Sequence, residues 1–331
     1  MTKTRDHGGG LDAAITRYGG PRTDWLDLST GINPVPYPVG GISSEAWSDL
    51  PDTTAQDRLI SAARSFWDVP EGLDIIAAPG ASALIARLPA LGSHIGTHIP
   101  GPTYNEHEAA FRSAGIDTSA HDLATHIYVH PNNPDGVDRR TEIAAASGLL
   151  TIIDESFCDT APELSTLPML GNKRALILKS FGKFWGLAGL RLGFAIAPPK
   201  VFAPTERLRL ASGMHQHNQF PTLQDLMGPW AVSGPALEVG ARALTDTGWA
   251  DATRKRLAHD SQRLDAMMTA AGVELVGGTS LFRLYDVGDA AAWQDKLARA
   301  HIWSRIFPYS DKWLRLGLPA PDRWDQLEAA L

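Results

Sequence analysis

Ser180, Lys183 and Arg191 lie in one short segment, residues 180–193, which reads S-F-G-K-F-W-G-L-A-G-L-R-L-G. The neighbours of Lys183 are small or apolar, and desolvation among such neighbours lowers the pKa of an amine. A neutral lysine can form a Schiff base with an aldehyde, while a hydroxyl group and a guanidinium group can bind a phosphate. The spacing therefore predicts a site for a phosphorylated aldehyde cofactor.

The elements around this segment must hold it on a rigid frame. Apolar runs at 175–178 and 192–197 flank it and are expected to be strands, so Lys183 should lie in the loop between them. Earlier in the chain, strands are expected at 74–78, 94–99, 127–130 and 149–154, and helices at 55–66, 82–91, 104–114 and 141–146. This alternation predicts an α/β fold, with a mainly parallel sheet flanked by helices.

We expect three parts in the chain: an N-terminal arm with part of a small domain over 1–44, a large cofactor-binding domain over 45–230, and a small α+β C-terminal domain over 231–331. Prolines and glycines at 31–41 exclude a helix there, because proline lacks the backbone donor and restricts the residue before it. A long helical region is expected from 202 to 270, and strands at 280–286 and 313–318. The small domain should combine both chain ends.

The composition is that of a globular protein without a basic surface. The 331 residues exceed one hydrophobic core, and the net charge of −7 argues against nucleic acid or an anionic membrane as a partner. No apolar run approaches the ~20 residues of a membrane span, and the stretch from Met1 to His7 has no apolar signal core, so a cytoplasmic location is expected. Cys158 is the single cysteine and has no partner at ligand spacing, so neither a disulfide nor a metal site is expected.

The segment around Lys183 resembles the cofactor-binding segment of fold-type I pyridoxal phosphate enzymes, the aspartate aminotransferase superfamily. Its members carry S/T-x-S/T-K-x-x-G-L/M-x-G-x-R-x-G, and the second hydroxyl position alone differs, being Gly182 here. The resemblance implies the fold of these PLP-dependent transferases, with Lys183 bound to pyridoxal 5'-phosphate and with Ser180 and Arg191 on its phosphate. It also implies a homodimer with the site at the interface.

Two polar residues after expected strands match the same superfamily. Asp154 closes the run 149–154, so its carboxylate should emerge at the carboxyl end of a strand, where such sheets bind ligands. The resemblance implies that it pairs with the protonated pyridine nitrogen. Asn133 lies in N-P-D-G, which by itself is a turn signal. The resemblance implies that its side chain donates a hydrogen bond to the ring oxygen of the cofactor.

Two further segments complete the expected cofactor site. A strand, the residues P-G-A-S and a helix follow one another, so the backbone amides of Gly80, Ala81 and Ser82 can face a phosphate at a helix N-terminus. Tyr104 in P-T-Y is implied by the resemblance to stack on the pyridine ring. With Lys183 and Asp154, Tyr104 makes up the expected catalytic set.

Both chain ends resemble the threonine-phosphate decarboxylases of cobalamin biosynthesis. The matching segments are D-H-G-G at 6–9, L-D-L-S-T-G-I-N-P at 26–34, R-I-F-P at 305–308 and R-L-G-L-P at 315–319. The resemblance implies decarboxylation of L-threonine O-3-phosphate, a small phosphorylated amino acid, to (R)-1-amino-2-propanol O-2-phosphate.

Such a substrate has two anionic ends, and basic residues near the chain ends suit both. Arg315 offers a planar fork for a carboxylate, while His7 and Arg305 can bind a phosphate from two sides. Asn33 of the N-P pair is the fourth expected substrate-binding residue.

Two alternative functions stay open. A histidinol-phosphate-type aminotransferase would use the same cofactor residues. However, two tyrosines that many of these aminotransferases carry are replaced here. Phe157 stands where a tyrosine hydrogen-bonds the phenolic oxygen of the cofactor, and Leu50 stands where a tyrosine reaches the cofactor phosphate of the partner subunit. A noncatalytic partner protein with this fold would have no need of an intact Lys183, Asp154 and Arg191.

Overall fold

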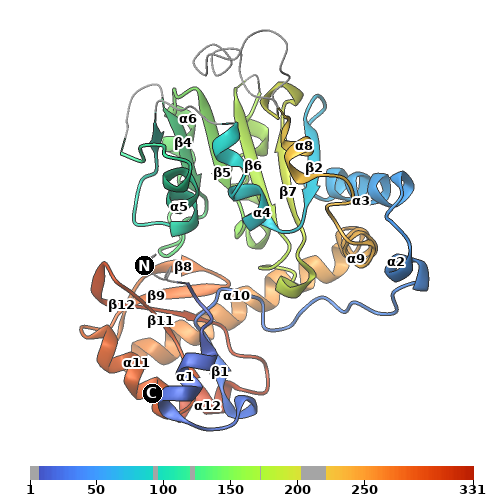
Figure 1. Ribbon diagram of the computed structural model, residues 1–331. Coiled ribbons are helices and arrows are strands. Elements are labelled where there is room, and N and C mark those ends of the chain that lie inside the picture. The colour runs from blue at the N-terminus through green and yellow to red at the C-terminus, as the bar shows by residue number, and fades with distance from the viewer. Residues whose placement is uncertain (1–6, 92–95, 120–123, 172, 203–220) are drawn as a thin grey trace.

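The computed structural model describes residues 7–91, 96–119, 124–171, 173–202 and 221–331. A large sheet with flanking helices lies above a smaller sheet in the view of Figure 1, and the long helix α10 (Thr247–Ala270) runs between them. Part of the helical region expected from 202 to 270, residues 203–220, lies outside the described residues. Within the described ranges, no helix is long and apolar enough to cross a membrane.

The large sheet has, in the described part of the chain, the order β2-β7-β6-β5-β4-β3. Its strands are β2 (Asp74–Ala78), β3 (Thr97–His98), β4 (Thr125–Val129), β5 (Leu150–Asp154), β6 (Ala175–Ser180) and β7 (Gly193–Ala197). The strands β3, β4, β5 and β6 pair in parallel, whereas β7 is antiparallel to both of its neighbours. The mainly parallel sheet expected from the sequence is confirmed.

Helices cover both faces of this sheet. They are α3 (Thr53–Phe66), α4 (Ala81–Ile85), α5 (Asn105–Ser113), α6 (Arg140–Ala145) and α8 (Leu223–Met227). Ile152 of β5 belongs to a core cluster with Leu84 of α4 and Phe111 of α5, whereas the next residue, Ile153, belongs to a cluster with Ile143 of α6. Successive strand residues face opposite sides, so β5, whose five residues are all buried, is covered on both faces.

The smaller part contains strands and helices from both chain ends. Its antiparallel sheet has the order β11-β12-β9-β8, from β8 (Glu274–Thr279), β9 (Phe282–Asp286), β11 (Arg305–Phe307) and β12 (Ser310–Gly317). Beside it, β1 (Leu26–Asp27) pairs in parallel with β10 (Ile302–Trp303). The accompanying helices are α1 (Leu11–Tyr18), α11 (Ala290–Arg299) and α12 (Trp324–Glu328). Trp25 packs with Leu11 of α1 and Ala298 of α11, which fastens the N-terminal region to the C-terminal one.

Among the elements that the sequence analysis did not give, two have a clear physical cause. The helix expected at 82–91 ends at Ile85 and is followed by a 3₁₀ turn, because Pro89 lacks the backbone N–H that a continued helix needs. Strand β8 was not expected, since glycine is a poor strand former. A Cβ at Gly277 would lie 2.3 Å from the carbonyl oxygen of Asp135, so close approach of two backbones explains this glycine.

The 3₁₀ helices are η1 (Arg22–Asp24), η2 (Leu88–Ala90), η3 (Cys158–Thr160), η4 (Pro162–Leu164), η5 (Leu167–Met169), η6 (Ala188–Leu190) and η7 (Pro199–Val201).

Residues 31–41 form an extended arm without helix or strand, as expected. The arm leads to α2 (Ser44–Ser48) and runs along the loop between β6 and β7, where the amide of Tyr37 donates to the carbonyl of Trp185 at 2.9 Å. The domain boundary predicted at 231 precedes α9 (Gly234–Thr245), and α9 packs against α3. Because α9 still packs on the large part, the chain passes to the small part only in the next helix, α10.

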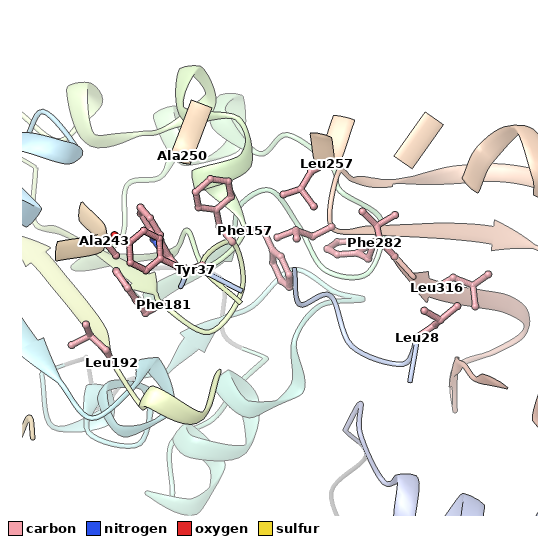
Figure 2. Close-up of a cluster of buried hydrophobic side chains, with 14 of the residues drawn as sticks. Leu28, Tyr37, Phe157, Phe181, Leu192, Ala243, Ala250, Leu257, Phe282 and Leu316 are labelled. Atoms are coloured by element: carbon pink, nitrogen blue, oxygen red, sulfur yellow. The ribbon is translucent and has the colours of Figure 1, made fainter. Parts of the chain in front are cut away.

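One apolar cluster joins the two parts of the molecule. In Figure 2, Phe157 lies between Tyr37 and Phe181 on one side and Phe282 and Leu316 on the other. The side chain of Phe157 is buried and meets the ring of Phe282 edge to face, with centroids 4.9 Å apart. This shared core fixes the small sheet against the end of the large one.

Candidate active site

A cavity of about 340 Å³ lies at the carboxyl ends of β4, β5 and β6 and is closed on the other side by β11 and β12. Parallel α/β sheets bind ligands at this end of their strands. The predicted residues that line it are His7, Ala81, Ser82, Tyr104, Asn133, Asp154, Ser180, Lys183, Arg191, Arg305 and Arg315. Two predicted residues, Gly80 and Asn33, do not line it.

Lys183 lies in the loop between β6 and β7, as the sequence predicts. Desolvation and the positive charges of Arg315 and Arg191 lower the pKa of its ammonium group to about 8, and the negative charge of Asp154 opposes them. The Nζ atom lies 5.6 Å from the centroid of the Phe157 ring. A pKa lowered in this way makes a neutral nucleophile available close to neutral pH.

Asp154 ends β5 and is buried, with its carboxylate held from two sides. Burial alone would raise its pKa, but hydrogen bonds from His107 and Ser156 and the interaction with His107 bring the pKa below its usual value. The Nε2 atom of His107 lies 2.9 Å from Oδ2, and the Ser156 hydroxyl donates to Oδ1 at 2.5 Å. Asp154 is therefore an ionised carboxylate that can face a cationic ring nitrogen.

The sequence analysis missed His107. It lies on α5, three residues after Tyr104, and the two rings meet edge to face with centroids 6.0 Å apart. Residues three apart share one face of a helix, so a histidine one turn after a site tyrosine was a signal for it. Because an ionised carboxylate only accepts, Nε2 carries the proton of this hydrogen bond.

Tyr104 and Ser82 join the start of α5 to α4 across the cavity wall. The side chain of Ser82 hydrogen-bonds the hydroxyl of Tyr104. Desolvation and the negative charges of Asp154 and Glu106 raise the pKa of Tyr104 to about 12. The phenol is thus neutral at neutral pH and presents an aromatic ring beside the carboxylate that the sequence assigns to the pyridine nitrogen.

Gly80 has a steric role and not the donor role expected of it. Its amide donates to the carbonyl of Ala78 at 2.7 Å, so this N–H group does not point to a ligand. The backbone is left-handed with φ of 87°, and a Cβ there would lie 2.7 Å from Nη2 of Arg191. A glycine therefore leaves room for the guanidinium group of Arg191, which also donates from Nη1 to the carbonyl of Ala188 at 3.1 Å.

Arg315 of β12 connects the small sheet to the turn after β4. Its Nη1 atom donates to the side-chain oxygen of Asn133, and its Nη2 atom donates to the carbonyl of Ser29 at 2.8 Å. Desolvation, with the charge of Arg305, lowers its pKa to about 10, so the guanidinium stays charged at neutral pH. Since the oxygen of the Asn133 amide faces Arg315, its NH₂ group is turned the other way and can donate to a ligand.

Arg305 and His7 form the outer wall. Arg305 is the register partner of Arg315 on the neighbouring strand β11, and opposed residues of antiparallel strands project on the same face. The Nη1 atom of Arg305 donates to the carbonyl of His7 at 2.6 Å, while Nε2 of His7 lies 3.1 Å from Oε1 of Glu106. The first described residue of the chain is thereby held over the cavity between the two parts.

Asn33 is placed differently from its prediction as a substrate ligand. It is buried, its Nδ2 donates to the carbonyl of Phe184 at 2.8 Å, and its Oδ1 accepts from Arg256 at 2.6 Å. The side chain is thus used within the protein and does not reach the cavity. Gly31, two residues earlier on the arm, lines the cavity in its place.

Comparison with known proteins identifies the group to which this arrangement belongs. The model of a family described as aminotransferase class I and II matches residues 127–330. This chain belongs to that aminotransferase family. It is 40% identical to a threonine-phosphate decarboxylase from Sinorhizobium sp., over 96% of this chain and 93% of the relative. A threonine-phosphate decarboxylase from Pseudomonas aeruginosa is 35% identical, over 98% and 97%.

A solved structure with the same fold is a histidinol-phosphate aminotransferase from Sinorhizobium meliloti in complex with pyridoxal-5'-phosphate. The TM-score is 0.77, at 18% identity, and the match covers 98% of this chain and 93% of that one. The fold-type I architecture expected from the sequence is confirmed for this member of the aminotransferase family.

Pyridoxal 5'-phosphate is the cofactor of this family, and the cavity fits it. Such a group needs an amine for its aldehyde, an anion for its ring nitrogen and donors for its phosphate. The cavity offers the neutralisable amine of Lys183, the ionised carboxylate of Asp154 and the guanidinium of Arg191 beside the space left at Gly80. Among the described lining residues, Asp154 is the one acid, and the other charged residues are cationic. Such a cavity suits an anionic cofactor together with an anionic substrate.

Proposed function

We propose that this chain decarboxylates L-threonine O-3-phosphate to (R)-1-amino-2-propanol O-2-phosphate, a step of cobalamin biosynthesis, with pyridoxal 5'-phosphate as cofactor. Two relatives that match it over nearly their full length are threonine-phosphate decarboxylases. Within the site, the proposal is carried by the pairing of Arg305 with Arg315 in register on β11 and β12. Two guanidinium groups on one face repel each other unless anions lie between or beside them, and this substrate brings a carboxylate and a phosphate.

The cofactor would be held by residues from four segments of the large part, each at or after the end of a strand. Arg191, Ser180 and Ser82 line the cavity and would bind the phosphate of the cofactor. Asp154 would face the ring nitrogen, and the NH₂ group of Asn133 would donate to the ring oxygen. Bound in this way, pyridoxal phosphate supplies an electron-accepting ring that stabilises the negative charge left on Cα when carbon dioxide departs.

The chain's own residues then orient the substrate and move one proton. Arg315 is buried and forked, so it suits the carboxylate, while Arg305 and His7 at the outer wall suit the phosphate. Binding both ends restricts the substrate to one pose before the carbon–carbon bond breaks. Lys183, whose pKa of about 8 lies close to neutral pH, can hold a proton on Nζ and return it to Cα.

A histidinol-phosphate aminotransferase is the second function expected from the cofactor residues. Phe157 argues against it, because this buried ring packs on Phe282 and offers no hydroxyl group where many aminotransferases have a tyrosine. Among curated relatives, a histidinol-phosphate aminotransferase from Mesorhizobium japonicum is 24% identical, whereas the two decarboxylases are 40% and 35% identical. We therefore favour decarboxylation.

A substrate comparison tests the proposal. Protein loaded with pyridoxal phosphate is given L-threonine O-3-phosphate alone, or L-histidinol phosphate together with 2-oxoglutarate. We expect carbon dioxide and aminopropanol phosphate from the first mixture and no glutamate from the second. Glutamate formation from histidinol phosphate, with no carbon dioxide from threonine phosphate, would support the aminotransferase instead.

We also propose a homodimer. Trp47 of α2 and Leu50 just after it are 69% and 66% exposed, and two large apolar side chains so close together on a surface mark an interaction site. Light scattering should give twice the mass of the chain, and the exchange Leu50→Asp together with Trp47→Asp should give monomers. A monomeric wild-type protein at micromolar concentration would contradict this.

The cytoplasmic location stays a prediction from the sequence.

A further inference from the structure

Asn33 lies outside the cavity, yet it contacts the backbone of the residue that the chemistry depends on. Its amide donates to the carbonyl of Lys183 at 3.0 Å, and its Nδ2 donates to the carbonyl of Phe184 at 2.8 Å. The side chain of Asn33 is 2% exposed. Two consecutive carbonyl groups of the Lys183 loop are thus bound by one residue of the N-terminal arm.

Arg256 of α10 holds Asn33 from the opposite side. Its Nη2 atom donates to Oδ1 of Asn33 at 2.6 Å, while its Nη1 atom donates to Asp260 at 3.2 Å, one turn further along the helix. Oδ1 also accepts from the amide of Val35 at 3.0 Å. Because the oxygen is occupied twice, the Asn33 amide group is fixed with its NH₂ toward the Lys183 loop.

The loop is shaped to receive the arm at this point. Gly186 has φ of 68°, and a Cβ there would lie 2.7 Å from Cα of Pro36 and 2.9 Å from the carbonyl oxygen of Asn33. The next residue back, Trp185, is stacked between Phe181 and Trp249, at centroid distances of 5.0 and 5.3 Å. Stacking thus anchors the loop at 185, while Asn33 fixes its backbone at 183 and 184.

We propose that Asn33 is a positioning residue for Lys183 and that Arg256 holds Asn33 in place. Lysine has a flexible four-carbon stem, so the position of its backbone decides where Nζ comes to rest in the cavity. Without the Asn33 side chain, the carbonyl of Phe184 loses its donor, and the peptide group at 184–185, directly after Lys183, must rotate or take up water. The inference rests on Lys183 as the cofactor-binding lysine of the proposed function, but on no particular substrate.

The experiment therefore uses no substrate. Protein freed of cofactor is mixed with pyridoxal phosphate, and formation of the covalent linkage to Lys183 is followed by its visible absorbance over a range of pH. Borohydride reduction and peptide mapping locate the linkage. Pyridoxamine phosphate, which lacks the aldehyde and cannot form the linkage, reports noncovalent binding through quenching of tryptophan fluorescence.

We expect Asn33→Ala and Asn33→Asp to slow linkage formation about tenfold or more, since small misplacements of a reacting group cost up to about hundredfold. The pH midpoint of the linkage absorbance should shift as well, while the dissociation constant for pyridoxamine phosphate stays within about twofold by the same reasoning. Arg256→Met should slow the linkage in the same direction, and Arg256→Lys, which keeps a donor, should restore most of the rate.

Arg242→Gln is the matched control. Arg242 binds the same arm, through the carbonyls of Val39 and Gly41, but does not contact the Lys183 loop in the described structure. It should leave linkage rate and pH midpoint unchanged. If Asn33→Ala fails to fold, the Arg256→Met and Arg256→Lys pair decides the question.

Three results would overturn the inference. An Asn33→Ala protein with the wild-type linkage rate and pH midpoint would overturn the inference alone. So would a loss of pyridoxamine phosphate affinity as large as the loss in linkage rate, because that outcome indicates general damage to the fold. A wild-type linkage that maps to another lysine would overturn both this inference and the assignment of Lys183 in the proposed function.

Discussion

Arg315 of the small sheet donates a hydrogen bond to the side-chain oxygen of Asn133, which lies on the turn after β4 of the large sheet. The contact joins the residue expected to bind the substrate carboxylate to the residue expected to bind the cofactor oxygen. It also fixes the amide of Asn133 with its NH₂ group away from Arg315. A change at either residue should therefore affect both cofactor and substrate.

The exchange Asn133→Asp separates the two functions of this side chain. It keeps an acceptor for Arg315 but removes the NH₂ donor, so affinity for pyridoxal phosphate should fall about tenfold, the size of one lost hydrogen bond to a charged group. Asn133→Ala also leaves Arg315 without its acceptor and should lower the free energy of unfolding by about 1–3 kcal/mol as well. Fluorescence titration and urea unfolding measure the two effects. Equal stability of both variants would contradict the role of the Arg315 contact.

Asp154→Asn should lower turnover about hundredfold at saturating cofactor, as is usual when one preorganised electrostatic contact is removed. An amide cannot balance the charge on a protonated ring nitrogen as a carboxylate does. Substrate affinity should change less, because Asp154 does not face the groups assigned to the substrate. Steady-state kinetics check this, and unchanged turnover would remove Asp154 from the mechanism.

His107→Phe tests the residue that the sequence analysis missed. The buried carboxylate of Asp154 would lose a donor at 2.9 Å, so the free energy of unfolding should fall by about 1–3 kcal/mol. Turnover should fall about tenfold, less than in Asp154→Asn, because the carboxylate remains but is less firmly held. His107→Gln keeps an N–H donor and should recover part of both losses. A turnover equal to wild type in His107→Phe would show that Ser156 alone is enough.

The pKa of Lys183 predicts how covalent loading depends on pH. The reactive amine is neutral, so the loading rate of the cofactor-free protein should rise with pH and level off above about 8, whereas an ordinary lysine would continue to about 10.4. Between these values the unfolded chain binds more protons than the folded one, so the cofactor-free protein should gain stability as pH rises through this window. Lys183→Met should abolish that gain. A loading rate that still rises steeply above pH 9 would contradict the lowered pKa.

Arg305 and Arg315 should differ in what they recognise. Arg305→Gln should reduce the preference for threonine phosphate over free threonine, measured as the ratio of kcat/KM values, by about tenfold to hundredfold. Arg315→Gln should lower kcat/KM for both substrates alike, because both carry the carboxylate. Arg299→Gln, which removes an exposed arginine paired with Asp295 outside the cavity, is the control. An unchanged preference in Arg305→Gln would place the phosphate elsewhere.

Much of the site could be predicted from the sequence because its residues follow strands. Asp154 and Ser180 are the last residues of β5 and β6, and parallel strands bring their carboxyl ends to one edge of the sheet. His107 could not be found in this way, because its partner Asp154 is 47 residues away and the pairing depends on how α5 packs. Asn33 was assigned to the substrate from its motif alone, and only the course of the arm shows that it faces the Lys183 loop.

For the fold, too, local sequence patterns could be read and contacts between distant residues could not. Buried strands such as β5 were found because each contains a short, mostly apolar run, and helix α3 because its apolar face repeats with helical spacing. The break of the expected helix at Pro89 and the glycine-containing strand β8 were not found. The first is a local effect of a proline that the apolar pattern does not register, whereas Gly277 is required by a neighbour distant in the chain, Asp135.

The central claim is that the carboxylate of threonine phosphate is lost and that no amino group is transferred. The most direct measurement follows carboxyl-labelled L-threonine O-3-phosphate with the cofactor-loaded protein in the absence of any 2-oxo acid. The account predicts labelled carbon dioxide and aminopropanol phosphate in equal amounts over many turnovers. Turnover that stops after one equivalent and resumes only with 2-oxoglutarate, with glutamate formed and the label retained, would contradict it.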